Sequence, residues 1–180
     1  MAENSKIVLA IDIQREYATD GRPYRISGID ASLPNARKVM EGARGAGVPV
    51  WHVRHVTDGP VFAAGSEYID FIPGFEPKNG EPVYTKALPS CFSSAELAQA
   101  VEAAKVKEIV VIGYNTSVCC ICTIIDGMHR GYGFTLVEDA VASMAANGVS
   151  EADMHRSGVN VARQFARVMS TEEAMSGLRS

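Results

Sequence analysis

The chain has 180 residues, of which 47% are hydrophobic and 21% charged, and its formal net charge at pH 7 is −4. This length predicts one domain spanning residues 1–180, and the composition is that of a globular protein, which excludes disordered and fibrous classes. A negative net charge without a basic stripe argues against a nucleic-acid partner and favours a small-molecule substrate.

The sequence also predicts where the protein works. Its apolar runs, such as residues 7–11 and 109–112, are far shorter than the roughly 20 residues that a membrane-spanning helix needs, so we expect no contact with a membrane. Residues 1–12 contain one lysine, and no small-residue cleavage pattern follows them. We therefore expect a cytoplasmic protein whose four cysteines remain thiols.

Predicted strands and helices alternate along the chain. Short apolar runs predict strands at residues 6–11, 49–54, 83–86, 108–112, 133–137 and 166–169. Helical spacing and capping residues predict helices at residues 29–46, 94–104, 119–129, 150–164 and from 171 onward. This alternation indicates right-handed crossovers and a three-layer α/β/α fold, with a six-stranded, mainly parallel sheet between helices on both faces.

Two irregular segments interrupt the alternation. Residues 16–28 are rich in Gly, Arg and Tyr, and residues 57–82 contain eight glycines and prolines without a period. Long loops in compact domains are usually functional, so both segments are expected to line or cover a pocket. Tyr17 and Tyr24 are candidates for contacts with a substrate.

Residues 110–127 predict a buried strand, a sharp turn at Gly113 and a helix that carries a cysteine. Thr116 or Ser117 would cap this helix. Cys119 would lie in the first turn, where unpaired backbone N–H groups and the helix dipole favour a thiolate. The alternative for this stretch alone is a cysteine that only packs in the core.

Charged side chains close two other predicted strands. Asp12 follows the strand at residues 6–11, and Lys86 ends the strand at residues 83–86. In an open parallel sheet, ligands bind outside the carboxyl ends of the strands, so an acid, a cation and a thiol are expected to meet at one edge. A turn cap is the alternative role for Asp12.

Taken in this order, the residues resemble the isochorismatase-like cysteine hydrolases. The resemblance covers about residues 7–169 and rests on Asp12, Gln14, Lys86, Ser90, Phe92, the segment 113–119, Thr123 and Asp126. It implies a catalytic triad of Asp12, Lys86 and Cys119. It also implies a cis peptide before Asn115 and an oxyanion hole made by the backbone amides of Asn115 and Cys119.

The residues and the resemblance together predict a cysteine-dependent amidohydrolase. Asp12 would accept the thiol proton, Lys86 would lower the thiol pKa, and Cys119 would attack a small amide, ureide or carbamoyl compound to form a thioester. Lys86→Met is expected to abolish turnover and to leave the fold intact. Further candidates for substrate binding lie near the triad in the sequence: Gln14, Phe92 and Cys120.

Neither a metal nor another cofactor is expected. Nicotinamidases of this family carry an Asp-x-His metal motif after the second strand, whereas this chain has Arg-His-Val-Thr-Asp at residues 54–58. His52 and His55 would point to opposite faces of a strand and could not share an ion. Activity should therefore survive chelation. The family often forms dimers or tetramers, so a homo-oligomer is expected.

Three other functions remain open on the sequence alone. The first is a vinyl-ether hydrolase of the isochorismatase type that relies on Asp12. The second is a thiol redox protein, since Cys119 and Cys122 form a C-x-x-C pair. The third is an α/β binding module without catalysis. For the cysteine-dependent amidohydrolase, the nucleophile should be Cys119, because one residue rotates Cys120 by about 100° and Cys122 lies a turn deeper.

Overall fold

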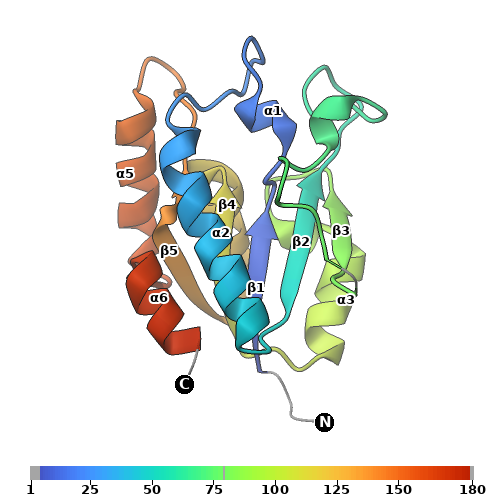
Figure 1. Cartoon of the computed structure of the whole chain (residues 1–180), viewed down its shortest axis with the longest axis vertical. Helices are drawn as coiled ribbons and strands as arrows, with labels where there is room; N and C mark the ends of the chain where they lie inside the picture. The colour runs from blue at the N-terminus through green and yellow to red at the C-terminus, as the bar shows by residue number, and fades with distance from the viewer. Residues whose placement is uncertain (1–4, 79, 179–180) are drawn as a thin grey trace.

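The computed structural model describes residues 5–78 and 80–178 (Figure 1). In this part of the chain, six strands form one sheet, and every pair of neighbouring strands is parallel. The strands are Lys6–Ile11 (β1), Val50–His55 (β2), Val83–Lys86 (β3), Glu108–Tyr114 (β4), Gly133–Ala142 (β5) and Arg167–Met169 (β6). Their order across the sheet is β3-β2-β1-β4-β5-β6.

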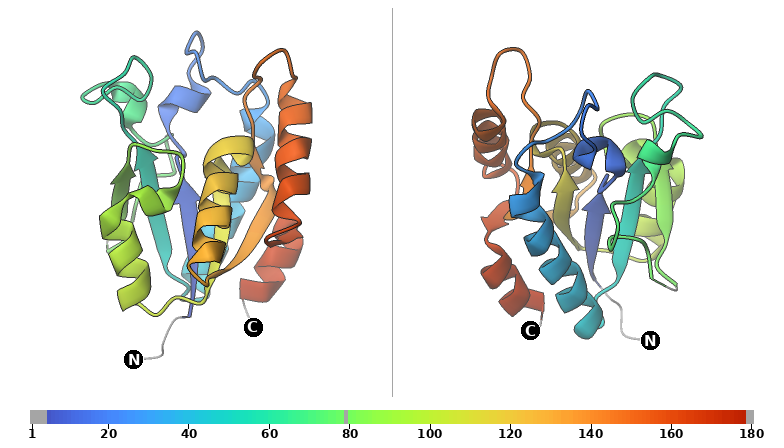
Figure 2. Two further views of the ribbon diagram at one scale, coloured as in Figure 1. Left: turned by 180° about the vertical axis from the view of Figure 1, so that it is seen from behind. Right: turned by 45° about the horizontal axis from the view of Figure 1, so that its top comes forward.

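Helices cover both faces of the sheet, which confirms the predicted three-layer fold (Figures 1 and 2). Helices α2 (Ile29–Gly45) and α6 (Thr171–Leu178) lie on one face. The other face carries α3 (Ala95–Ala103), α4 (Ile121–His129) and α5 (Glu151–Ala162). None of the helices in the described residues is long and apolar enough to cross a membrane.

The core consists of two apolar clusters, one on each face of the sheet. In β1, Ile7, Leu9 and Ile11 pack toward α3 and α4, whereas Val8 and Ala10 pack toward α2. This alternation follows from the two-residue period of a strand. Because β1 and its neighbour β4 are buried on both faces, their sequences are almost continuously apolar.

The strand order places a ligand-binding crevice at a defined point. From β1 the chain builds outward through β2 to β3, and it then returns to β4 on the other side of β1. The connections after β1 and β4 therefore leave in opposite directions, and a crevice opens outside the carboxyl ends of these two strands. Short elements lie around this end: α1 (Arg15–Ala18), η1 (Glu67–Ile69), η2 (Cys91–Ser93) and η3 (Thr116–Cys120).

Strand β5 is longer than predicted. The expected strand ended at residue 137, but β5 continues to Ala142 after a register shift opposite residues 111–113 of β4. Glu138 and Asp139 fall at this irregularity, where their side chains leave the sheet to bind Arg163 and the start of α6. The short helix α1 and the turn η1 are likewise absent from the prediction, which gave irregular loops there.

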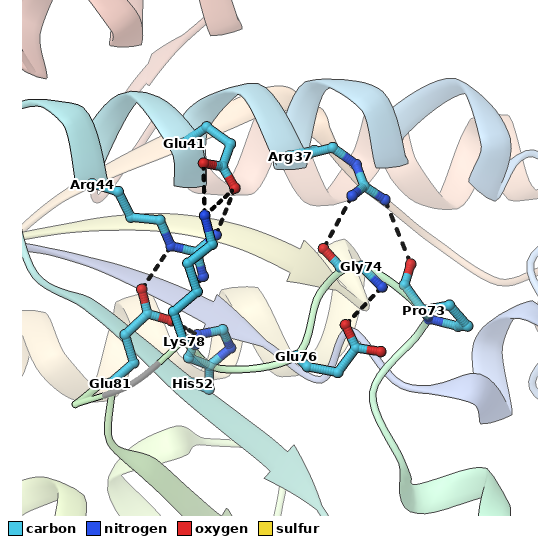
Figure 3. Close-up of polar contacts among 9 residues, drawn as sticks. All are labelled: Arg37, Glu41, Arg44, His52, Pro73, Gly74, Glu76, Lys78 and Glu81. Carbon is cyan, nitrogen blue, oxygen red and sulfur yellow. Dashed lines mark hydrogen bonds and ion pairs between the residues drawn. The ribbon is translucent and has the colours of Figure 1, made fainter.

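The long connection between β2 and β3 is fastened to α2 (Figure 3). The Arg44 guanidinium makes two hydrogen bonds of 2.7 Å to the Glu81 carboxylate, which also accepts from His52 Nε2 at 2.8 Å. Nearer the start of α2, Arg37 donates to the carbonyls of Pro73 and Gly74. Partial burial opposes ionisation of Glu81, but the bonds from Arg44, from the Lys78 N–H and from His52 lower its pKa to about 2.

Candidate active site

The carboxyl ends of β1, β3 and β4 bring Asp12, Lys86 and Cys119 together. Lys86 Nζ lies 2.8 Å from Asp12 Oδ2 and 3.4 Å from Cys119 Sγ. The side chains of Asp12 and Lys86 are 0% exposed, and Cys119 is 6% exposed. The three residues that the sequence analysis grouped at one sheet edge are therefore in contact, and the ammonium lies beside both acidic groups.

The backbone after β1 aims Asp12 at the crevice. Asp12 adopts a φ of 50°, a left-handed conformation that Asp tolerates better than most residues, and its N–H donates to Val53 O at 2.9 Å. Apart from its contacts with Lys86 and Cys119, its carboxylate accepts no hydrogen bond from the described residues. The Asp12 carboxylate therefore faces the Lys86 ammonium and the Cys119 thiol.

Close contact between β1 and β4 brings the cysteine turn to Asp12. Gly113 has a φ of +106°, and a Cβ on it would lie 2.1 Å from the carbonyl oxygen of Ile11. Only glycine fits this position without displacing a central strand. The peptide bond between Tyr114 and Asn115 is cis.

The turn that presents Cys119 differs from the prediction. Residues Thr116–Cys120 form a π-helical turn ahead of α4, and the side chain of Asn115 caps it by accepting the Ser117 N–H at 3.1 Å. The predicted cap was Thr116 or Ser117, but the helical turn already begins at Thr116, so the cap is Asn115, one residue before the earlier of the two predicted positions. Thr123 Oγ1 donates to the carbonyl of Cys119 at 2.7 Å and fixes the other side of the turn.

His55 is a fourth member of the site that the sequence analysis weighed only as a metal ligand. It ends β2, and its Nδ1 lies 2.8 Å from Lys86 Nζ. The Lys86 ammonium can only donate hydrogen bonds, so His55 Nδ1 is the acceptor. Burial and the neighbouring ammonium lower the pKa of His55, which keeps its imidazole neutral. Its place at a strand end on the same edge as Asp12 was the signal that could have identified it.

Cys119 rests as a thiol. Burial and the Asp12 carboxylate raise the pKa of Cys119 to about 12, and they outweigh the opposite effects of Lys86 and of the Asn115 N–H. This corrects the expectation that Lys86 and the helix start would produce a thiolate. Burial is the main cause of the raised pKa, because the sulfur of Cys119 is almost completely shielded from solvent. Burial opposes the charge of Lys86 too, but the Asp12 carboxylate outweighs this effect, so the pKa of Lys86 is raised and the side chain stays a cation.

A cavity of about 290 Å³ opens over the sulfur. Its reactive end is formed by Cys119, His55 and Asn115. The irregular segments at residues 16–28 and 57–82 contribute its aromatic wall, which contains Tyr17, Tyr24 and Phe62. The remaining lining is also mainly apolar: Ala87, Pro89, Val118, Met144, Ala146 and Met154.

Three residues considered for substrate binding lie outside this cavity. The Gln14 side chain is fully buried and braces the end of β2 by accepting the His55 N–H at 2.7 Å. Phe92 stacks on Tyr132 with ring centroids 5.6 Å apart. Cys120 is 0% exposed, and its Sγ lies 3.9 Å from Gly113 O. All three side chains point into the core, so they help to hold the site in place and do not line the cavity.

The same edge contains atoms of the types that bind metals. Ligand atoms of Asp12, His55 and Cys119 lie within 4.8 Å of one another. However, Lys86 Nζ lies 2.8 Å from both Asp12 Oδ2 and His55 Nδ1, so its ammonium takes the place that a metal cation would need. His52 binds Glu81 instead. The expectation that activity survives chelation stays a prediction.

Comparison with known proteins identifies the family of the chain. Residues 6–173 match the isochorismatase domain. The chain belongs to the isochorismatase family. The family that the sequence resembled is thereby confirmed, and the protein is an isochorismatase-family hydrolase.

This isochorismatase-family hydrolase is similar to proteins with several different described activities. It is 34% identical to the secreted isochorismatase effector Isc1 of Verticillium dahliae, over 93% of this chain and 88% of that one. It is 26% identical to the maleamate amidohydrolase of Pseudomonas putida, over 96% and 86%. Among solved structures, a cysteine hydrolase from Pseudomonas syringae pv. phaseolicola superposes with a TM-score of 0.91 at 25% identity, over 99% and 94% of the two chains.

Proposed function

We propose that this isochorismatase-family hydrolase cleaves the C–N bond of small amides through a thioester on Cys119. The observation that carries the proposal is the contact of one buried ammonium with both a carboxylate and a thiol, beneath a cavity. The names of similar proteins support the reaction class, since a maleamate amidohydrolase and an N-carbamoylsarcosine amidase of Arthrobacter are both relatives.

In the first step, the Cys119 sulfur attacks the amide carbonyl while its proton passes to Asp12. Because the pKa of the thiol is raised, this transfer is proposed to accompany the attack, with Asp12 as the general base. Lys86 remains charged and stabilises the carboxylate before the transfer and the sulfur during it. The backbone N–H groups of Asn115 and Cys119 are proposed to hold the tetrahedral oxyanion, a contribution of about 3 kcal/mol per donor.

In the second step, the tetrahedral intermediate collapses and the C–N bond breaks. Asp12 returns the proton to the departing nitrogen, so ammonia or an amine leaves and a thioester remains on Cys119. Water then attacks the thioester while Asp12 accepts its proton, the C–S bond breaks, and Asp12 passes the proton to the departing sulfur of Cys119. The products are a carboxylic acid and the free thiol, and one water is consumed in each cycle.

The test is ammonia release from a panel of small amides, ureides and carbamoyl compounds. We expect turnover by the wild type, none by Cys119→Ala, and nearly normal turnover by Cys122→Ala, a matched thiol that does not line the cavity. A panel without ammonia release, or a Cys119→Ala protein that still releases it, would contradict the proposal.

A second candidate is a vinyl-ether hydrolase, which the name of the relative from Verticillium dahliae favours. In that reaction Asp12 supplies a proton to the substrate and Cys119 forms no bond. The same Cys119→Ala variant separates the two proposals, because it would retain vinyl-ether cleavage and lose amide cleavage. That relative is named as a secreted protein. For this chain we propose a cytoplasmic location and a homo-oligomeric state.

A further inference from the structure

We propose that the substrate of this site is a neutral amide with a compact apolar acyl group, and that the site rejects amides carrying a carboxylate. The inference rests on the proposed function and adds the substrate class. It comes from the chemistry of the cavity wall beyond the reacting atoms, whose described residues contribute aromatic rings, two tyrosine hydroxyls and thioethers but no cationic side chain.

The aromatic wall is a packed unit whose geometry is set before a substrate arrives. The Phe62 ring lies edge-on to Tyr17 at 5.2 Å, to Tyr24 at 5.9 Å and to His55 at 5.0 Å between centroids. Tyr17 is 3% and Phe62 2% exposed, so these rings are fixed by the core behind them. Such a wall favours apolar or flat groups through area and ring contacts.

The remaining apolar side chains come from the segment after β3, which contributes Ala87 and Pro89, from the cysteine turn, from the segment between β5 and α5 and from α5 itself. Val118 is next to the nucleophile in sequence, and Met144 and Met154 come from the end of β5 and from α5. Thioether side chains are flexible and adapt to the shape of an apolar group. Together with the volume of about 290 Å³, they indicate a small branched or flat acyl group.

Charge decides against an anionic substrate. Among the described residues that line the cavity, none is Arg, Lys, Asp or Glu. Lys86 lies behind the lining, with a side chain that is 0% exposed and an ammonium already matched by Asp12. Arg22, from the segment that also carries Tyr24, is bound to the Glu16 carboxylate at 2.8 Å and to Pro60 O at 3.1 Å. A substrate carboxylate would lose water and find no counter-ion.

The neutral His55 does not supply that counter-ion. Its pKa is lowered, and its Nδ1 already accepts from Lys86. Protonating it would place a second cation beside the ammonium. Among the described residues of the lining, the polar groups besides those that handle the amide are the neutral hydroxyls of Tyr17 and Tyr24, which carry no charge to match a carboxylate.

A pair of substrates with the same shape tests the inference on the intact protein. Succinamate and 4-methylpentanamide have the same chain and the same reacting amide, but the first ends in a carboxylate and the second in an isopropyl group. We expect kcat/KM to favour 4-methylpentanamide by about 100-fold or more, the effect of burying a charge without a partner. Succinamate cleaved equally well or better would overturn the inference and leave the proposed function standing.

A variant with an added cation supplies a second, independent readout. Met154→Lys places an ammonium on the cavity lining and should shift the ratio toward succinamate by at least about tenfold. Met154→Gln is the matched control, with a similar length and no charge, and should keep the wild-type preference. An equal shift in both variants would show that charge is not the cause and would count against the inference.

The two proposals fail in different ways. If neither member of the pair nor any other amide releases ammonia, the proposed function is contradicted and the substrate class falls with it. If amides are cleaved without regard to a carboxylate, only the substrate class is wrong. Thermal unfolding of both Met154 variants shows that the compared proteins are folded.

Discussion

The Lys86 ammonium contacts an acid, an imidazole and a thiol at the same time, at 2.8, 2.8 and 3.4 Å. Lys86→Met removes this charge and leaves the Asp12 carboxylate buried without a counter-ion. We expect turnover to be lost and the free energy of unfolding to fall by about 3–5 kcal/mol, as measured by ammonia release and urea denaturation. The expectation from the sequence that Lys86→Met leaves the fold intact stays a prediction, to which the structure adds a lower stability.

The control for this prediction removes both charges. An Asp12→Asn, Lys86→Met double variant has no unpaired buried ion and should regain much of the lost stability, while it remains inactive. A folded Lys86→Met protein with near-normal turnover would show that the ion pair has only a packing role.

His55 positions Lys86 by accepting its hydrogen bond, which makes it sensitive to pH. Burial and Lys86 lower its pKa below 6.5, so His55 is neutral at pH 7 and gains a proton only as the pH falls through the lowered value. That proton would repel Lys86, so activity and stability should both decline on the acid side. His55→Leu should lower kcat/KM by roughly 10- to 100-fold through the lost acceptor.

His55→Gln is the matched variant, because its amide oxygen can accept from Lys86 and does not titrate. The loss in kcat/KM should be smaller for His55→Gln than for His55→Leu. The activity of His55→Gln should also fall less at acid pH than that of the wild type, because the amide gains no proton. Superimposable profiles for the wild type and His55→Gln would exclude the proposed role of the imidazole.

Among the elements, the junction of β1 and β4 allows the least change. A Cβ at Gly113 would lie 2.1 Å from the backbone oxygen of Ile11, and the φ of +106° is unfavourable for alanine. Gly113→Ala should therefore lower the free energy of unfolding by about 3 kcal/mol or more and reduce activity through displacement of Asp12. Chemical denaturation and ammonia release measure the two effects.

Gly45 in α2 provides the comparison for that variant. A Cβ there would meet nothing within 4 Å, and the residue is helical, so Gly45→Ala should stabilise the protein by up to about 1 kcal/mol. Equal stability changes at the two glycines would mean that the contact with Ile11 is not limiting.

Element prediction succeeded where the signal was local. The apolar runs of β1 and β4 and the capped start of α5, where Ser150 Oγ accepts the Asp153 N–H, follow from patterns within a few residues. Element prediction failed where the structure of a segment depends on pairing with residues far away in the sequence. The extension of β5 depends on pairing with β4 past a bulge.

The site shows the same division. The edge shared by Asp12, Lys86 and Cys119 follows from parallel topology, which the sequence indicates. The state of the thiol depends on burial, and the contact of His55 with Lys86 depends on the register between β2 and β3, where the two residues are paired. Similarly, Gln14 lies beside Asp12 in sequence, yet its side chain turns to the β2 end.

The Glu81 carboxylate connects the β2–β3 segment to α2 through hydrogen bonds. We therefore expect it to contribute to the loss of stability of the whole fold at acid pH. Its pKa is lowered to about 2, so its stabilising effect is complete above pH 4.5 and is lost as the pH falls toward 2. Glu81→Gln should reduce the free energy of unfolding at pH 7 by roughly 2–3 kcal/mol and flatten its decline below pH 4.5.

Glu67→Gln is the control, because Glu67 is a largely exposed carboxylate in a single ion pair with Arg15. It should change the free energy of unfolding by less than about 1 kcal/mol at either pH. An unchanged acid response in Glu81→Gln would locate the acid sensitivity elsewhere in the molecule.

The most direct test of the mechanism is to trap the covalent intermediate. The wild type is mixed with 4-methylpentanamide, or with the best amide of the panel, and quenched in acid within the first turnovers, and the digested protein is analysed by mass spectrometry. We predict an acyl group on the peptide containing residues 116–122, assigned by fragmentation to Cys119 and absent from Cys119→Ala. Amide turnover without any acyl adduct, or an adduct on Cys120 or Cys122, would contradict Cys119 as the nucleophile.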